Sequence, residues 1–315
     1  MSHTILALSK LNSAERDSLY QQGFKILDPE ALTSADYANI EIIYGWDAKI
    51  GPAILATPNN QLKWIQSFSA GVDYFPLAKL KEAKITLTNA SGLKAHPIAQ
   101  TILGYILHFA RGLNYYVNQH NWQTDLDQYT IAELPTVIFG TGQIGRELAR
   151  QLKALGGTVY GINSTGHPVT NFDRTFSLDD YKEALELSKV IINVLPATDK
   201  THHFFNEAFF KAAAGSFLYV NAGRGVTTDS QALIAAIDKN LIQYAALDVT
   251  EEEPLNQNSD LWRHPNILLT QHTSWVEHAG QGPASNLFSI FSQNIPAFLN
   301  NQTLPVNVVD LNRGY

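Results

Sequence analysis

The chain has 315 residues, 45% of them hydrophobic and 16% charged, with a net charge of −7 and no cysteine. This length suits two domains of ordinary size. The acidic balance, with no basic block, argues against a nucleic-acid partner, and the lack of cysteine excludes disulfides and thiolate chemistry. Because we find no signal-peptide pattern and no apolar run of membrane-spanning length, we expect a cytoplasmic protein with no membrane partner.

Short apolar runs alternate with segments of helical period along the whole chain. This alternation is typical of βαβ units, in which helices cover a parallel sheet. In the first part of the chain we expect one helix, at 11–22, and strands at 5–8, 41–44, 62–66 and 85–88. A single long helix is expected from Pro97 to about Trp122, because proline is well tolerated in the first turn of a helix.

The second part of the chain predicts a larger sheet. Six strands are expected, at 137–139, 158–162, 190–194, 217–220, 245–249 and 267–270. Helices are expected between them, at 143–155, 178–187, 206–213 and 229–239. A last helix, at 283–299, is long enough to lead the chain back to the first domain. The pattern predicts an α/β protein with doubly wound sheets.

The sequence F-G-T-G-Q-I-G at 139–145 follows a predicted strand and opens a predicted helix. In that context, three glycines at this spacing are typical of a turn that holds the pyrophosphate of a dinucleotide. Gly140 permits the turn, Gly142 lets the backbone approach the phosphates, and Gly145 allows close helix–strand packing. The cofactor contacts expected here come from Gly140, Gly142, Gln143, Ile144 and Gly145.

The end of the next strand bears on which dinucleotide binds. Enzymes that use NAD usually place an acid there to bind the ribose 2′-hydroxyl. This chain has Asn163, Ser164 and Thr165 instead, and no acid before Asp173. Neutral side chains do not repel a 2′-phosphate, and His167 could add a positive partner, although no arginine is present. We therefore favour NADP(H) slightly over NAD(H).

Three polar residues follow the last three predicted strands: Arg224, Glu253 and His272. In an open α/β sheet, ligands bind beyond the carboxyl ends of the strands. Each residue alone has an ordinary structural explanation, since glutamates in a run are usually solvated and single arginines or histidines often lie on the surface. Together, on the cofactor's side of the sheet, they indicate a catalytic group.

These segments resemble the D-isomer-specific 2-hydroxyacid dehydrogenase family over most of the chain. The motifs that carry the resemblance are Ser69–Asp73, the glycine turn, Asn193–Pro196 with Thr201, Asn221–Gly225, Asp248–Leu255 and Thr270–His272. The resemblance implies a Rossmann-type dinucleotide-binding domain at 97–286, inserted into a flavodoxin-like substrate-binding domain formed by 1–96 and 287–315.

The resemblance also implies roles for individual residues. Arg224, Glu253 and His272 match the family's catalytic residues, the backbone of Ala70, Gly71 and Val72 matches its carboxylate-binding loop, and the remaining cofactor contacts fall on Pro196, Thr201, Ala222 and Asp248. The chemistry agrees: Arg224 can hold a carboxylate, and His272 can donate a proton during reduction while Glu253 orients its ring. A nicotinamide cofactor would supply the hydride.

The branch of the family is suggested by three similarities. The chain length, the lead-in at 64–67 and the C-terminal Arg313-Gly314-Tyr315 resemble the glyoxylate/hydroxypyruvate reductase-like branch, which reduces small 2-oxo acids to D-2-hydroxy acids. Phosphoglycerate dehydrogenase-type activity is the alternative, with Lys94 and His96 as candidates for a substrate phosphate. A dinucleotide-sensing regulator without turnover is a further alternative.

Three departures from the family pattern could reshape the pocket and make a substrate assignment by analogy unsafe: Gln271 in place of a common proline, Trp275 in place of small residues and Thr250 in place of an aromatic residue. Gln100 in place of a glutamate is a further departure. Ten histidines are present, including His202 and His203, but none lies in a metal-ligand motif, so we expect no metal. The resemblance implies a homodimer, with the helix from Pro97 to Trp122 at the contact.

Overall fold

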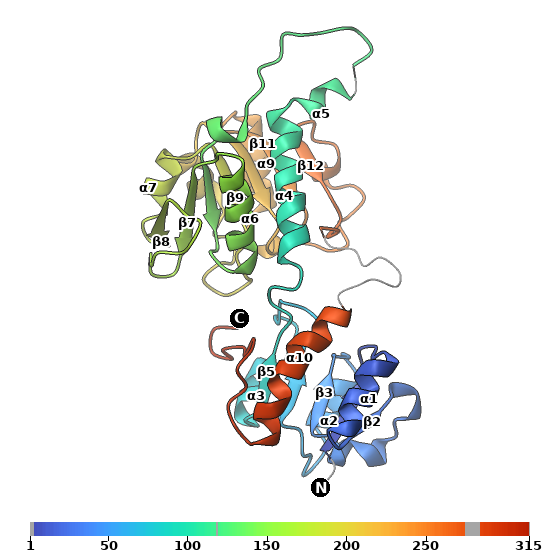
Figure 1. Cartoon of the computed structure of the whole chain (residues 1–315). Helices are drawn as coiled ribbons and strands as arrows, with labels where there is room; N and C mark the ends of the chain where they lie inside the picture. The colour runs from blue at the N-terminus through green and yellow to red at the C-terminus, as the bar shows by residue number, and fades with distance from the viewer. Residues whose placement is uncertain (1–2, 118, 275–283, 315) are drawn as a thin grey trace. The chain divides into compact units, whose positions relative to one another are not determined.

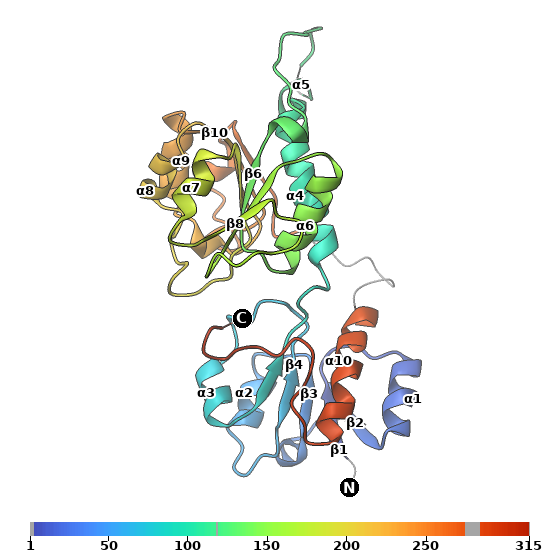
Figure 2. The same cartoon turned by 60° about the vertical axis from the view of Figure 1, so that its left-hand side comes forward.

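The computed structural model describes residues 3–117, 119–274 and 284–314. Two compact units make up the chain, one of Met1–Leu93 with Glu277–Tyr315 and one of Lys94–Val276 (Figures 1 and 2). Trp275 and Tyr315, both named in the sequence analysis, lie outside the described residues, as does position 283, where the last expected helix starts.

The first unit has a parallel five-stranded sheet in the order β2-β1-β3-β4-β5. Its strands are β1 (His3–Ala7), β2 (Phe24–Leu27), β3 (Ile42–Tyr44), β4 (Trp64–Gln66) and β5 (Thr86–Thr88). This is the flavodoxin-like order. The four strands expected here are present, and the edge strand β2 was missed because its four residues carry no alternating pattern.

The helices of the first unit come from both ends of its sequence. They are α1 (Ser13–Gln21), α2 (Ile50–Leu55), α3 (Leu77–Glu82) and α10 (Ala284–Leu299), with 3₁₀ turns η1 (Pro29–Ala31) and η2 (Ser34–Asn39). Phe291 of α10 stacks on the buried Trp64 of β4, with ring centroids 4.5 Å apart. A bridge between Thr88 and Val308 attaches the C-terminal segment to β5. The last helix therefore completes the core of the first unit, as its length suggested.

The second unit has a parallel seven-stranded sheet in the order β12-β11-β10-β9-β6-β7-β8. Its strands are β6 (Thr136–Phe139), β7 (Val159–Asn163), β8 (Arg174–Ser177), β9 (Val190–Asn193), β10 (Ser216–Asn221), β11 (Ile242–Leu247) and β12 (Ile267–Leu269). Counted from β6, this is the Rossmann order 3-2-1-4-5-6 with one further strand at the edge. The six expected strands are present, and the short edge strand β8 was missed.

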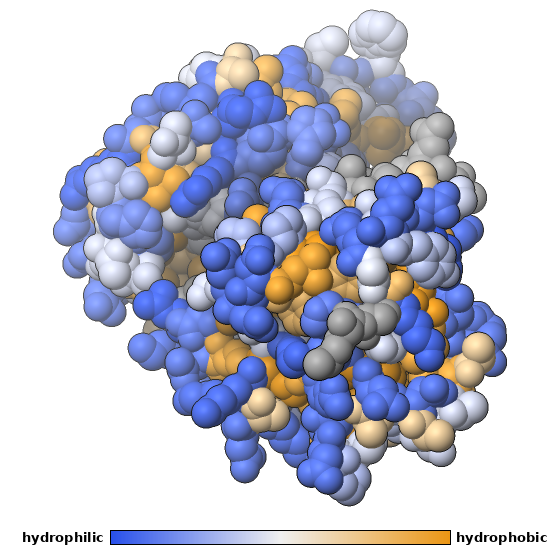
Figure 3. All heavy atoms as spheres, turned by 60° about the horizontal axis from the view of Figure 1, so that its bottom comes forward, coloured by the Kyte–Doolittle hydropathy of each residue, from blue (hydrophilic) through white to orange (hydrophobic). Residues whose placement is uncertain are grey.

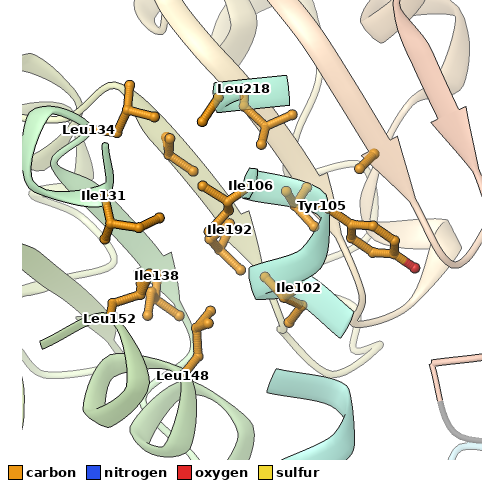
Figure 4. Packing of buried hydrophobic residues seen from close by; sticks show 14 of the residues in the cluster. Ile102, Tyr105, Ile106, Ile131, Leu134, Ile138, Leu148, Leu152, Ile192 and Leu218 are labelled. Atoms are coloured by element: carbon orange, nitrogen blue, oxygen red, sulfur yellow. The ribbon is translucent and has the colours of Figure 1, made fainter. Parts of the chain in front are cut away.

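Helices cover both faces of the larger sheet. They are α4 (Ala95–Ala110), α5 (Leu113–Tyr116), α6 (Gln143–Ala154), α7 (Tyr181–Glu186), α8 (Glu207–Ala212) and α9 (Ser230–Asp238), with 3₁₀ turns η3 (Ile131–Glu133), η4 (Gly225–Thr227) and η5 (Asp260–Trp262). Alternate strand residues face opposite ways. Ile138 thus packs with α4 and α6 (Figure 4). Its neighbours Val137 and Phe139 pack on the other face with α7, α8 and α9.

The long helix expected from Pro97 to Trp122 is shorter than predicted. α4 ends at Ala110, because Gly112 adopts φ +66°, a left-handed conformation that ends a helix. The four-residue α5 follows, and Trp122 lies in the loop after it with 96% of its surface exposed. Figure 1 shows α5 and this loop extending away from the rest of the second unit.

The surface in Figure 3 is mostly hydrophilic, with hydrophobic side chains gathered in separate patches. Among the described residues, no helix has the length and apolar character that a membrane crossing requires.

Candidate active site

The glycine turn joins β6 to α6 at the carboxyl edge of the larger sheet. Gly140 has φ +107°, which favours glycine, and a Cβ at Gly145 would lie 2.0 Å from the carbonyl oxygen of Gly140. Gly142 is the N-cap of α6, has no side chain to cap the helix, and has open space where a Cβ would stand. The first N–H groups of α6, from Gln143 and Ile144 onward, therefore face a space that a pyrophosphate can fill.

Asn163, at the end of β7, folds the next four residues into a closed turn. Its amide nitrogen donates to the carbonyl of His167 at 2.9 Å, and its oxygen accepts from the N–H of Thr165 at 3.1 Å. The hydroxyl of Thr165 contacts Nδ1 of His167 at 2.9 Å. Ser164 lies exposed within this turn. The turn carries no acid.

Asp173, the first acid after this turn, lies at the other end of β7. Its carboxylate accepts from the N–H of Val159, the first residue of β7, and from Nζ of Lys153, at 2.8 Å and 2.7 Å. The Asp173 carboxylate therefore lies at the amino end of the strand and does not face the turn at Asn163.

The loop after β9 contains Pro196 and Thr201. Thr201 is buried, and its hydroxyl donates to the carbonyl of Pro196 at 2.7 Å and accepts from the N–H of Thr198 at 2.9 Å. A Cβ at Gly223 would lie 2.6 Å from the carbonyl oxygen of Leu195, so this loop packs directly on the turn that holds Ala222. Thr201 thus fixes the shape of the loop through its side chain.

Arg224 follows β10 and is held through its backbone. Its carbonyl accepts from the side chains of Asn221 and Thr227, and its guanidinium donates to the carbonyl of Gly223 at 3.0 Å. A Cβ at Gly225 would lie 1.8 Å from the carbonyl oxygen of Thr250, which places the turn after β10 against the turn after β11.

The three consecutive glutamates after β11 have different surroundings. Glu251 accepts from the N–H of Ser230 at 2.8 Å and pairs with Nε2 of His203 at 2.5 Å. Glu252 is exposed. Glu253 pairs with His272, its Oε2 lying 2.8 Å from Nδ1 of the imidazole. The structure thus brings Glu253 beside the candidate histidine and directs Glu251 and Glu252 elsewhere.

The pair of Glu253 and His272 is accessible to solvent, with 39% and 54% of the two side chains exposed. With Glu253 ionised, Nδ1 carries a hydrogen and donates a hydrogen bond to the carboxylate. Nε2 then remains available to exchange a proton with the substrate. A hollow of about 420 Å³ opens beside the pair. Thr250 and Gln271, two of the departures from the family pattern, contribute to its lining.

Asp248 organises the loop that carries His272, which we call the histidine loop (residues 270–274). Its buried carboxylate accepts from the hydroxyl of Thr270 at 2.7 Å and from the N–H groups of Thr273 and Ser274 at 3.0 Å and 3.2 Å. Its carbonyl accepts from the N–H of His272 at 2.7 Å. The resemblance assigned Asp248 to the cofactor, and this supporting role was missed. The sequence held one signal for this role: Asp248 lies at the end of an apolar strand, where a buried carboxylate needs hydrogen-bond partners.

The loop at 69–73 belongs to the first unit. Three of its carbonyls are engaged: that of Ser69 by the N–H of Ala90, that of Ala70 by the side chain of Asn89, and that of Gly71 by the hydroxyl of Ser69. Within the described residues, no hydrogen bond uses the N–H groups of Ala70, Gly71 or Val72. Successive N–H groups without partners form a concavity suited to an anion.

No group of three His, Asp or Glu side chains positioned to hold a metal is found in the part of the chain that the structure describes.

The seven-stranded sheet, its glycine turn and the residues at its carboxyl edge define a dinucleotide-binding α/β protein of the dehydrogenase class. A family model described as "D-isomer specific 2-hydroxyacid dehydrogenase, NAD binding domain" matches residues 103–274. The chain belongs to this family. The resemblance read from its motifs, the fold class and the enzyme class are thereby confirmed.

Three relatives illustrate the range of similarity. Glyoxylate/hydroxypyruvate reductase B of Klebsiella pneumoniae subsp. pneumoniae is 28% identical over 269 residues, covering 81% of each chain. The crystal structure of phosphoglycerate dehydrogenase from Lactobacillus plantarum is 36% identical, covers 98% of this chain and all of that chain, and has a TM-score of 0.58. A D-isomer specific 2-hydroxyacid dehydrogenase from Xanthobacter autotrophicus Py2, in complex with NADPH and MES, is 25% identical, covers all of both chains and has a TM-score of 0.82.

Proposed function

We propose that this dehydrogenase reduces a small 2-oxo acid, of the glyoxylate or hydroxypyruvate kind, to the D-2-hydroxy acid. The observation that carries the proposal is the contact between His272 and Glu253, at the same sheet edge as the glycine turn. Supporting it, the Klebsiella pneumoniae relative that aligns over most of this chain is a glyoxylate/hydroxypyruvate reductase.

The reaction assigns one task to each polar group. The N–H groups of Ala70, Gly71 and Val72 bind the substrate carboxylate, and the guanidinium of Arg224 holds the substrate and polarises its carbonyl. His272 donates a proton from Nε2 to the carbonyl oxygen, and Glu253 stabilises the imidazolium that holds this proton before transfer. The bound nicotinamide supplies the hydride.

For the cofactor we propose NADP(H) over NAD(H). The turn at 163–167 offers hydroxyl and amide groups and one imidazole, with no carboxylate to repel a 2′-phosphate. Asp173, which could have been that carboxylate, is held at the far end of β7 by Lys153. The Xanthobacter autotrophicus relative was solved with NADPH, which supports the same choice.

A spectrophotometric panel at 340 nm tests both parts of this proposal. NADH and NADPH are crossed with glyoxylate, hydroxypyruvate, pyruvate and bulkier 2-oxo acids. We expect the highest kcat/KM for a small substrate with NADPH. A higher kcat/KM with NADH would contradict the cofactor assignment, and tight cofactor binding with no turnover of any 2-oxo acid would favour a dinucleotide-sensing regulator.

A second candidate is phosphoglycerate dehydrogenase-type activity, favoured by the 36% identity with the Lactobacillus plantarum enzyme. One of the two residues considered for a substrate phosphate, His96, is instead paired with Glu147, with Nδ1 and Oε1 2.7 Å apart. We therefore rank this activity second. A higher kcat/KM for phosphohydroxypyruvate than for hydroxypyruvate would reverse the order.

We also propose that the protein is a homodimer that associates through α4, α5 and the loop after α5. Leu113, Val117 and Trp122 are exposed along this segment, by 47%, 69% and 96%. Exposed apolar side chains gathered on one segment mark an association surface.

A further inference from the structure

Tyr105 is an unexpected residue in the buried face of α4. The other buried side chains of this face are apolar and need no hydrogen bond; they include Ala99, Ile102, Ile106 and Phe109. Tyr105 is only 5% exposed. In Figure 4 its hydroxyl points away from the labelled aliphatic side chains. A buried hydroxyl is costly unless it has a partner, so this position demands one.

The hydroxyl of Tyr105 lies near three residues of this site, Thr270, Ser274 and Asp248, and its hydrogen bond goes to Thr270, the first residue of the histidine loop. The two hydroxyl oxygens lie 2.7 Å apart, and Thr270 donates its own proton to the carboxylate of Asp248, also at 2.7 Å. Because a threonine hydroxyl has one proton, Thr270 accepts from Tyr105. Burial raises the pKa of the Tyr105 phenol, so it remains a donor across the working pH range.

The far end of this chain of hydrogen bonds reaches His272. Asp248 accepts from two N–H groups of the histidine loop and, through its carbonyl, from the N–H of His272. One helical turn before Tyr105, the hydroxyl of Thr101 lies 3.4 Å from the carbonyl of Ser274. Helix α4 therefore contacts both ends of the histidine loop.

The histidine loop needs such support. His272 has φ +55°, a region that residues other than glycine seldom adopt and that persists only when the surroundings hold it. Its imidazole is exposed, so packing does little to fix the direction in which Nε2 points.

We propose that Tyr105 is a positioning residue for proton transfer: through Thr270 and Asp248 it holds the histidine loop so that His272 stays aligned on Glu253. The proposal rests on the function proposed above, because it assigns Tyr105 to the same acid–base site. Tyr105 itself touches neither substrate nor cofactor in this scheme.

Tyr105→Phe removes the hydroxyl and keeps the ring. We expect kcat to fall about fivefold, the effect of losing one ordinary hydrogen bond, with the KM for the cofactor unchanged. Tyr244→Phe is the matched control. Tyr244 stacks on Phe109 of α4 at 4.6 Å, and its hydroxyl makes no hydrogen bond within the described residues, so this variant should keep the wild-type kcat. Equal losses in the two variants would overturn the proposal.

A double-mutant cycle with Thr270→Val tests the route. If Tyr105 acts through Thr270, then adding Tyr105→Phe to Thr270→Val should lower kcat no further. Additive losses would show that Tyr105 acts by another path, contrary to the proposal. The pH profile of kcat/KM should change in Tyr105→Phe and not in Tyr244→Phe.

Amide hydrogen exchange separates this proposal from the proposed function. Tyr105→Phe should speed exchange in the segment 270–274, where the N–H groups of His272, Thr273 and Ser274 bond to Asp248, and leave the strands of the larger sheet unchanged. Unchanged exchange at 270–274, or faster exchange throughout the second unit, would overturn the positioning role. If the wild type reduces no 2-oxo acid, the proposed function fails, and the exchange result still decides the role of Tyr105.

Discussion

His272 is held in its left-handed backbone conformation by its neighbours. Its N–H donates to the carbonyl of Asp248, and its imidazole meets Glu253 at 2.8 Å. Two acids of the turn after β11 therefore hold this residue. The buried Asp248 binds its backbone, and the exposed Glu253 orients its imidazole. This arrangement lets a single residue exchange protons at Nε2 while its other nitrogen is occupied.

Replacing this histidine tests the acid–base assignment. We expect His272→Gln to lower kcat by about 10²-fold or more, because glutamine cannot exchange a proton, while NADPH affinity stays within twofold. Turnover is measured at 340 nm and affinity by fluorescence titration. His264→Gln serves as control, since His264 pairs with Asp238 away from the histidine loop. A normal kcat in His272→Gln would contradict the assignment.

Two glycines of the nucleotide turn should respond differently to alanine. In Gly145→Ala the new methyl group would meet the carbonyl of Gly140 at 2.0 Å, so we expect a loss of about 1–3 kcal/mol in the free energy of unfolding. Gly142→Ala places its methyl group in open space, so the protein should keep its fold but lose at least about tenfold in dinucleotide affinity, since that space is needed by the phosphates. Thermal unfolding and NADPH titration separate the two effects. Wild-type affinity in Gly142→Ala would argue against a pyrophosphate at this turn.

At the scale of elements, α4 and α6 are joined by an ionic cluster as well as by apolar packing. Glu147 of α6 pairs with His96 of α4 at 2.7 Å and with Arg150 at 2.7 Å, and Gln151 donates to it. The hydrogen bond from Arg150, helped by Gln151 and His96, lowers the pKa of the Glu147 carboxyl to about 2. The carboxylate is only 19% exposed, so solvent screens this cluster less than an open surface pair.

Glu147→Gln should therefore destabilise the protein in a pH-dependent way. A carboxyl whose pKa is lowered on folding stabilises the folded state above its ordinary value near 4.5, and this contribution is lost as pH falls toward 2. We expect Glu147→Gln to lower the free energy of unfolding by about 1 kcal/mol at pH 7, and we expect this difference from the wild type to shrink between pH 4.5 and pH 2. Urea denaturation at pH 7, 4 and 3 measures it. Glu186→Gln, at an exposed position, should match the wild type throughout. A loss that stays constant across this range would contradict the ionic origin.

At the scale of the whole molecule, the exposed segment after α4 bears on assembly. Trp122 exposes nearly its entire surface, and Figure 1 shows its loop extending from the second unit. We expect a homodimer in solution and expect Trp122→Ser to raise its dissociation constant at least about tenfold, as for an aromatic side chain central to an interface. Light scattering after size exclusion measures this. Tyr20→Ser, at an exposed position on α1, should leave the dimer intact. A monomeric wild type would contradict the proposed assembly.

Strand and helix positions were largely predictable because hydrophobic period and glycine placement are local properties of the chain. Ten strands were expected, and each is present in one of the two sheets. The two that were missed, β2 and β8, are four-residue edge strands, each paired with the strand directly before it in the chain. The helix after Pro97 was predicted too long, because Gly112 turns the chain after Ala110 and only the four-residue α5 follows it.

The sequence by itself determined the two parallel sheets, the glycine turn and the three polar residues that follow β10, β11 and β12. These residues were predictable as a group because parallel strands bring their carboxyl ends to one edge of the sheet whatever the side-chain details. Only the tertiary structure decided that Asp248 holds the histidine loop, that Asp173 turns away from the nucleotide end of β7, and that Tyr105 reaches the histidine loop. These contacts join residues far apart in the chain. They depend on packing distances of a few ångströms, which no local pattern in the sequence encodes.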